Sequence, residues 1–311
     1  MLSGSIIRHR SGAWKSRFVA ESCADIAVFV EEPFQPWQEL LGAEVRVRIG
    51  FLLMTSASQA MKAALNNSEA YDGRVAVAMD LVEIPAGEFW MGCEAGRADE
   101  NPVHRVYVDA FAMGATTVTN QQYRLFAEAT GEAVPPAANN PCFTDPSQPV
   151  VAVTWFNAMD YCSWLSRETG YSFRLPTEAE WEWAVRDGRD RALYAWGDDP
   201  PETLERYSTG SQQQGPHPVA LHPSNRLGLY DLGDNVHEWC FDWYDPDYYS
   251  RAPWNNPVNL DPTARRASRG GAWRHQVKVS RCAARSSLSP EFAYTDYGFR
   301  VVRAREIRMD K

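Results

Sequence analysis

The feature that most constrains the fold is a long stretch without regular periodicity, residues 189–265. It shows no sustained helical or strand repeat and is rich in Trp, Gly, Pro and Asp. Ordered loops of this length are uncommon in compact domains and usually serve a function. The chain also has 12 Trp, 13 Tyr and 13 Phe, and large rings hold irregular segments in place where long helices and strands are absent. The sequence therefore predicts a loop-rich domain.

Regular elements are predicted on both sides of this stretch. The clearest helix start lies at Thr177 and Glu180, which form a T-x-x-E capping box. Strands, then helices, then long loops, then strands again are typical of an α+β fold and not of βαβ alternation. The predicted strands are 81–93 (two strands around a turn at Ala86 and Gly87), 104–114, 267–273, 277–286 and 297–304, and the predicted helices are 119–131, 154–170 and 174–188.

The two ends of the chain differ from this pattern. The apolar residues of 1–79 show no sustained period. We interpret this segment either as a poorly structured N-terminal extension or as an over-called start. In the second case translation begins at one of three methionines, Met54, Met61 or Met79. Residues 306–311 are interpreted as a C-terminal tail.

Composition narrows the function classes. The formal net charge is −9, which opposes a nucleic-acid partner because such affinity rests largely on Lys and Arg neutralising phosphates. No apolar run reaches the roughly 18 residues of a membrane span, and the apolar core at 49–54 is too short for a signal peptide. The six cysteines form no C-x-x-C pair. We therefore expect reduced thiols and a cytoplasmic protein.

Nine short motifs follow one another between residues 81 and 305. They are IPAGEFWMG (84–92), TVTNQQY (117–123), VTWFNAMDYCSWL (153–165), RLPTEAEWEWAVRDG (174–188), YAWGD (194–198), GLYDLGDNVHEW (228–239), SRGGAW (268–273), RCAARS (281–286) and YGFRVV (297–302). In this order they resemble the formylglycine-generating enzyme, or sulfatase-modifying factor, family. The resemblance implies a domain at 80–305 with the family's own fold, a variant of the C-type lectin fold with little regular secondary structure.

One departure from the family concerns its chemistry. Members that make formylglycine oxidise a cysteine of sulfatases with dioxygen, using two cysteines that bind copper(I). Paired thiolates are natural ligands for this soft ion. Here the first cysteine position falls at His275 and the second near Val277. The resemblance therefore argues against formylglycine formation by copper thiolates in this chain.

Two further cysteines match positions that form disulfides in secreted members. The partner position of Cys282 is Val185, and that of Cys162 is Val301. The resemblance thus implies that both disulfides are absent, in agreement with a cytoplasmic location.

The motif YDLGDNVHEW matches a calcium site of the family. The resemblance implies four ligands, namely side-chain oxygens of Asp231 and Glu238 and backbone carbonyls of Asp234 and Val236. Hard oxygen ligands on a tight turn suit Ca²⁺. Asp234 stands where the family usually has Gly, but only its carbonyl is required. The alternative is that Asp231 and Glu238 simply cap turns in an acidic loop.

Two histidines fall at the family's pocket. His275 takes a cysteine position, and His237 replaces a residue that lines the groove in some members. A pair of imidazoles can bind iron or copper, or one of them can act as a general base. A carboxylate would complete an iron-type set, but the sequence does not identify one. The alternative is that both are hydrogen-bonded packing residues.

The remaining polar residues are interpreted structurally. His104 is expected to be structural, and His217 and His222 flank prolines in a loop and form no constellation in the sequence. Five charged residues are expected in buried ion pairs or in contact with loop carbonyls, because an aromatic loop fold must satisfy its backbone. They are Arg174, Glu180, Arg281, Arg285 and Arg300, and Arg285 has the alternative of meeting an anionic substrate.

Two classes of function follow from these features. The first is an oxidoreductase or maturation factor of the family that acts on a peptide or small molecule through His275 and His237. The second is a non-catalytic lectin-like module, because this fold also supports recognition without chemistry. The residues expected to line its ligand pocket are Trp273, Arg274, Trp239 and Arg285, together with His275. The oligomeric state does not follow from the sequence.

Overall fold

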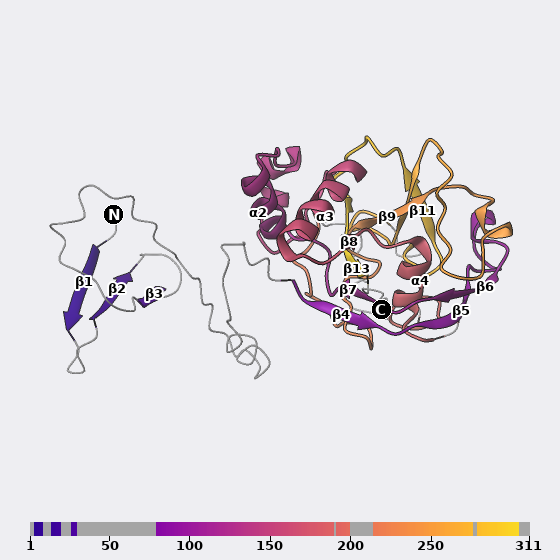
Figure 1. Cartoon of the computed structure of the whole chain (residues 1–311), viewed down its shortest axis with the longest axis horizontal. Coiled ribbons are helices and arrows are strands. Elements are labelled where there is room, and N and C mark those ends of the chain that lie inside the picture. The colour runs from indigo at the N-terminus through magenta and orange to yellow at the C-terminus, as the bar shows by residue number, and fades with distance from the viewer. Residues whose placement is uncertain are drawn as a thin grey trace, which may run out of the picture. The chain divides into compact units, whose positions relative to one another are not determined.

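The chain divides into two compact units, Met1–Asp72 and Gly73–Lys311. They are seen in a computed structural model (Figure 1). The structure describes residues 79–189, 191–199, 214–275 and 279–304 in full, and the backbone of three strands in the first unit.

The three strands of the first unit form one antiparallel sheet in the order β1-β2-β3. They are β1 (Ser3–Arg8), β2 (Trp14–Val19) and β3 (Ile26–Phe29). The rest of the predicted extension, and the predicted tail at 306–311, lie outside the described residues. The choice between an extension and a later start therefore stays a prediction.

The second unit contains a four-stranded sheet in the order β4-β7-β13-β8. Its strands are β4 (Leu81–Ile84), β7 (Phe111–Gly114), β13 (Val302–Ala304) and β8 (Phe173–Arg174). Beside it, β5 (Gly87–Met91) and β6 (His104–Val108) form an antiparallel pair. The single strand predicted at 104–114 is therefore two strands. They belong to different sheets, because the chain leaves the pair with β5 after Val108 and begins to pair with β4 at Phe111.

A second four-stranded sheet has the order β11-β10-β9-β12. Two of its strands, β9 and β11, are labelled in Figure 1. Its strands are β11 (Arg285–Leu288), β10 (Arg266–Arg269), β9 (His237–Trp243) and β12 (Tyr297–Gly298). β9 and β12 are parallel and place Tyr297 opposite His237. The strand predicted at 267–273 ends early at Arg269, because Gly270 has a φ of 77°, in the left-handed region that favours glycine.

The three predicted helices are confirmed, each preceded by a threonine cap. They are α2 (Asn120–Thr130), α3 (Trp155–Thr169) and α4 (Glu178–Arg186). The predicted box at Thr177 and Glu180 is present, with the side chain of each residue accepting from the other's backbone N–H. Short 3₁₀ turns complete the regular structure, namely η2 (Ala98–Glu100), η3 (Pro136–Asn139), η4 (Pro141–Phe143) and η6 (Tyr248–Ser250).

Large rings fill the core between the helices. Tyr123 and Phe126 of α2 pack against Tyr161 and Trp164 of α3, with the rings of Phe126 and Tyr161 5.6 Å apart. A second cluster surrounds Trp181 of α4 and reaches both sheets. Each ring fully removed from water contributes about 1.5–3 kcal/mol. These observations confirm the α+β class.

The predicted ion pairs are confirmed. Arg174 binds Glu180, and Arg281 binds Glu100 through both carboxylate oxygens. Arg285 binds Glu178, while Arg300 binds Glu238 through two donors. No helix among the described residues has the length and apolarity to cross a bilayer.

Candidate metal centre

Three elements of the second sheet bring His237, His275 and Asp296 together. His237 is the first residue of β9, and Asp296 directly precedes β12. Because β9 and β12 run side by side, the His237 backbone N–H donates to the Asp296 carbonyl at 2.8 Å. The turn at Gly270 returns the chain from β10, and a second turn from Ala272 to His275 places the His275 side chain beside them.

The two imidazoles are in direct contact. Nε2 of His237 lies 2.9 Å from Nδ1 of His275, so one nitrogen donates to the other. Nε2 of His275 lies 3.5 Å from Oδ2 of Asp296. One ligand atom from each of the three residues lies within 4.8 Å of those of the other two. Asp296 is thus the carboxylate that the sequence does not identify.

The electrostatics favour a neutral imidazole beside a buried carboxylate. Burial lowers the pKa of His237 to about 3, and His275 adds to the effect. His237 is therefore neutral near pH 7 and keeps a nitrogen lone pair, the form that binds metal ions. Asp296 is 1% exposed, and its Oδ2 accepts from Nε of Arg274 at 2.9 Å. Its Oδ1 is buried without a hydrogen-bond partner, which suits a further positive group.

The predicted pocket residues separate into two pairs. Trp273 and Arg274 adjoin His275, with Trp273 half-buried and Arg274 exposed. Trp239 is 0% exposed and donates to the Val153 carbonyl inside the core. Arg285 is 2% exposed and bound to Glu178. It therefore lies in a buried ion pair, as the sequence predicts, and does not meet a ligand at the surface.

The predicted calcium ligands are partly engaged. Both oxygens of Glu238 accept from Arg300, and Oε2 also accepts from Trp181. Oδ2 of Asp231 accepts from the Ala220 N–H, and Oδ1 is buried without a hydrogen bond, 4.0 Å from Nδ1 of His217. Asp231 therefore fits a cation better than Glu238 does, since only Oε1 of Glu238 keeps room for another contact.

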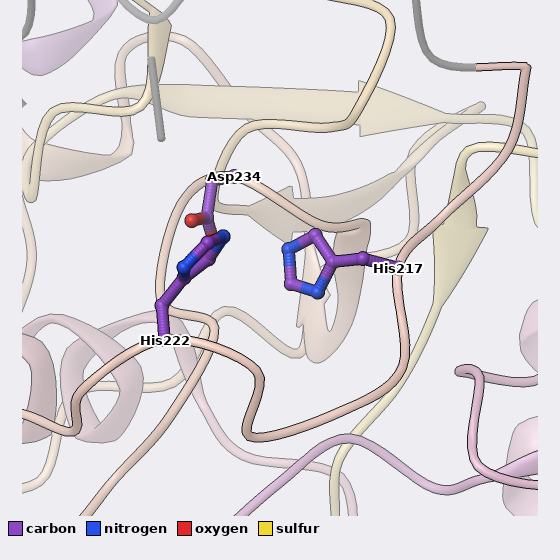
Figure 2. A group of neighbouring side chains, drawn as sticks. All are labelled: His217, His222 and Asp234. Atoms are coloured by element: carbon purple, nitrogen blue, oxygen red, sulfur yellow. The ribbon is translucent and has the colours of Figure 1, made fainter. Parts of the chain in front are cut away.

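A second cluster contradicts the reading of His217 and His222 as histidines without a constellation. Both lie beside Asp234, with one ligand atom of each residue within 4.8 Å of the others (Figure 2). The sequence gives no signal that Asp234 joins the two histidines, because the loop brings it to them from 12 and 17 positions away.

Two buried cysteines, Cys240 and Cys282, are unsuited to act as nucleophiles. Burial raises the pKa of Cys282 to about 12 and that of Cys240 well above its ordinary value, and such thiols are unreactive. The prediction of free thiols is confirmed for the five cysteines in the described ranges, Cys93, Cys142, Cys162, Cys240 and Cys282. Cys23 and Val277 lie outside the described residues.

Comparison with known proteins identifies the family. Residues 68–305 match the model of the sulfatase-modifying factor enzyme 1-like domain. The chain is 31% identical to a formylglycine-generating enzyme of Streptomyces coelicolor, covering 70% of this chain and 87% of that protein. It is 32% identical to the serine/threonine-protein kinase pkn1 of Chlamydia caviae, covering 71% of this chain but only 37% of the relative's length.

Solved structures confirm the fold. PvdO from Pseudomonas aeruginosa matches with a TM-score of 0.66 and 26% identity, covering 74% of this chain and 96% of that chain. Treponema denticola variable protein 1 matches with a TM-score of 0.63 at 23% identity, covering 72% of this chain and 95% of that one, and shows the fold alone. The predicted lectin-like α+β fold is therefore confirmed, and the chain belongs to the sulfatase-modifying factor family.

Proposed function

We propose that this chain is an oxidoreductase or maturation factor of its family, with a non-haem metal ion held by His237, His275 and Asp296. The contact of 2.9 Å between the two imidazoles carries the proposal. Of the two, His275 stands at a position that the resemblance assigns to a copper-binding cysteine in members that make formylglycine. Two imidazoles and one carboxylate form the set typical of non-haem Fe²⁺, and the same donors also accept Cu²⁺. Such an ion supplies electron transfer and activation of dioxygen when bound.

The protein's own residues would hold and orient the site. His237 is buried and neutral, so its lone pair needs no deprotonation. Arg274 fixes Asp296 through Oδ2, and partners of this kind orient the groups that bind an ion. The side chain of His275 is 38% exposed, which leaves a route for a peptide or small molecule. Trp273 and Arg274, on the same turn, are placed to contact such a substrate.

Calcium is proposed as a separate structural ion beside this site. The support is Oδ1 of Asp231, which is buried and accepts no hydrogen bond. Asp231→Asn is the suitable variant, because removal of Glu238 would leave the buried guanidinium of Arg300 without its carboxylate.

We also infer a cytoplasmic location from the free thiols. Thiol labelling of the chain in intact cells would test this location.

The test is the metal content of the full-length chain after aerobic purification. Wild type is compared with His275→Ala, Asp296→Asn and Asp231→Asn, and with His104→Gln as a histidine outside both clusters. Near-stoichiometric iron or copper that is lost in the first two variants and kept in the last two supports the proposal. Calcium alone, lost in Asp231→Asn and unchanged in His275→Ala, would contradict the redox site and favour the lectin-like binding module.

A further inference from the structure

We propose that His217, His222 and Asp234 form a second metal site, which binds Zn²⁺. His217 and His222 lie on one loop, and Asp234 lies on the turn that leads into β9. Figure 2 shows the three side chains pointing toward one another. The two imidazole rings are 5.0 Å apart between centroids and inclined at 75°. They do not stack, and one nitrogen of each ring lies within 4.8 Å of the other and of a carboxylate oxygen of Asp234.

His217 carries the strongest indication of a missing partner. Its Nδ1 lies 2.9 Å from the carbonyl oxygen of Pro218. A carbonyl only accepts, so this contact assigns the proton of a neutral ring to Nδ1 and the lone pair to Nε2. Nε2 is buried and has no hydrogen-bond partner. An imidazole whose far nitrogen donates to a backbone carbonyl is the usual arrangement of a metal-binding histidine.

Hydrogen bonds hold the two segments in register. The His217 N–H donates to Oδ1 of Asn235, and Nδ2 of Asn235 donates back to the His217 carbonyl, each at 3.1 Å. The Ala220 N–H donates to Oδ2 of Asp231 at 2.9 Å. Asn235 directly follows Asp234, so these bonds fix the loop against the residue that supplies the carboxylate. A site held by such contacts loses little freedom when an ion binds.

The donor set selects the class of ion. Imidazole nitrogens suit transition metals, whereas Ca²⁺ and Mg²⁺ prefer oxygen ligands. Two histidines and one carboxylate are three of the four ligands of tetrahedral Zn²⁺, and the fourth position is left for water. His222 and Asp234 are half-buried, so solvent can reach that position. This proposal is independent of the redox centre, because it shares no residue with His237, His275 and Asp296.

The test separates the two sites by working in the His275→Ala background. The chelator-treated full-length protein is titrated with Zn²⁺, and separately with Co²⁺, whose visible bands report tetrahedral nitrogen and oxygen ligands. We expect His275→Ala to bind one equivalent. Adding His222→Ala or Asp234→Asn should weaken this binding at least about 10- to 100-fold. Adding His104→Gln should leave it unchanged, and excess Ca²⁺ should not displace it.

Two outcomes would overturn the site. One is that the His275→Ala protein binds no Zn²⁺. The other is that its affinity is the same after His222→Ala and after Asp234→Asn. His222 is half-buried, and urea unfolding of each variant establishes that it is folded. If the His222→Ala protein is unfolded, its loss of Zn²⁺ binding says nothing about the site. Asp234→Asn, which keeps the shape of the side chain, is then the deciding variant.

Discussion

The ion-pair network around α4 differs from the loops that carry His217, Asp231 and Asp296 in how its buried polar atoms are paired. In the network, Glu178 accepts hydrogen bonds from Arg269 and Arg285. Glu182 accepts from Arg186 and Arg269, so every oxygen of the two carboxylates has a partner. In the loops, Oδ1 of Asp296, Oδ1 of Asp231 and Nε2 of His217 are buried without one. Buried polar atoms are almost always paired. From this contrast we infer structural charge in the first region and candidate ligand-binding groups in the second.

The largest effect is expected from breaking the network. Glu178→Gln keeps the size of the side chain but leaves Arg269 and Arg285 without their shared carboxylate. Removing one partner of a buried pair costs about 3–5 kcal/mol, so the free energy of unfolding in urea should fall by this amount. Glu83→Gln, at the exposed pair with Arg303, is the control and should have little effect. Equal losses in both variants would contradict the distinction.

The pH dependence of stability tests the contribution of the Glu178 carboxylate in the network. Burial raises the pKa of Glu178, but Arg285 and Arg269 outweigh it and leave the pKa below its ordinary value of 4.5. The unfolded chain therefore binds the proton first as pH falls. The contribution of Glu178 should be complete above pH 4.5 and decline as pH drops further. Unfolding free energies measured from pH 6 to pH 3 should slope less in Glu178→Gln, and an identical slope would contradict this.

The loops that carry the histidines should also respond to metal. Without metal, His275→Ala leaves Nε2 of the buried His237 unpaired and should cost about 1–3 kcal/mol. With Fe²⁺ or Cu²⁺ at 100 times its Kd, wild type should gain about 2.7 kcal/mol. Both proteins are measured in a His222→Ala background, which removes the second site. There the His275→Ala variant should gain no stability at the same metal concentration. A matching gain in His275→Ala would place the bound ion elsewhere.

The smallest effect concerns the local cap of α4. The Thr177 side chain accepts from the Glu180 N–H at 3.1 Å, and Thr177→Ala should cost about 1 kcal/mol. Because the cap lies in the scaffold, metal binding should not change. Reduced metal affinity in Thr177→Ala would show that the two regions are coupled.

Sequence predicts the scaffold better than the site for a physical reason. The caps at Thr119 and Thr177 depend on residues three positions apart, so their signal is local. The pairing of Arg174 with Glu180 is local in the same way. His275 was identified because a motif fixes its position in the family. Elements of this kind can be read without knowing the packing of the chain.

The remaining site residues depend on how loops meet. Asp296 joins His237 only because β12 pairs with β9, which no spacing in the sequence indicates. His217, His222 and Asp234 meet for the same kind of reason. Trp239 was expected in the pocket, but its position on β9 turns it into the core. Long-range pairing therefore decides which polar residues become a site.

The most direct test of the central claim is X-ray absorption at the metal edge of iron- or copper-loaded protein in the His222→Ala background. The proposed ligands are two imidazoles and one carboxylate in place of two thiolates. We expect nitrogen and oxygen ligands with imidazole scattering and no sulfur, and loss of this signal in His275→Ala. A sulfur shell, or a spectrum unchanged by His275→Ala, would contradict it.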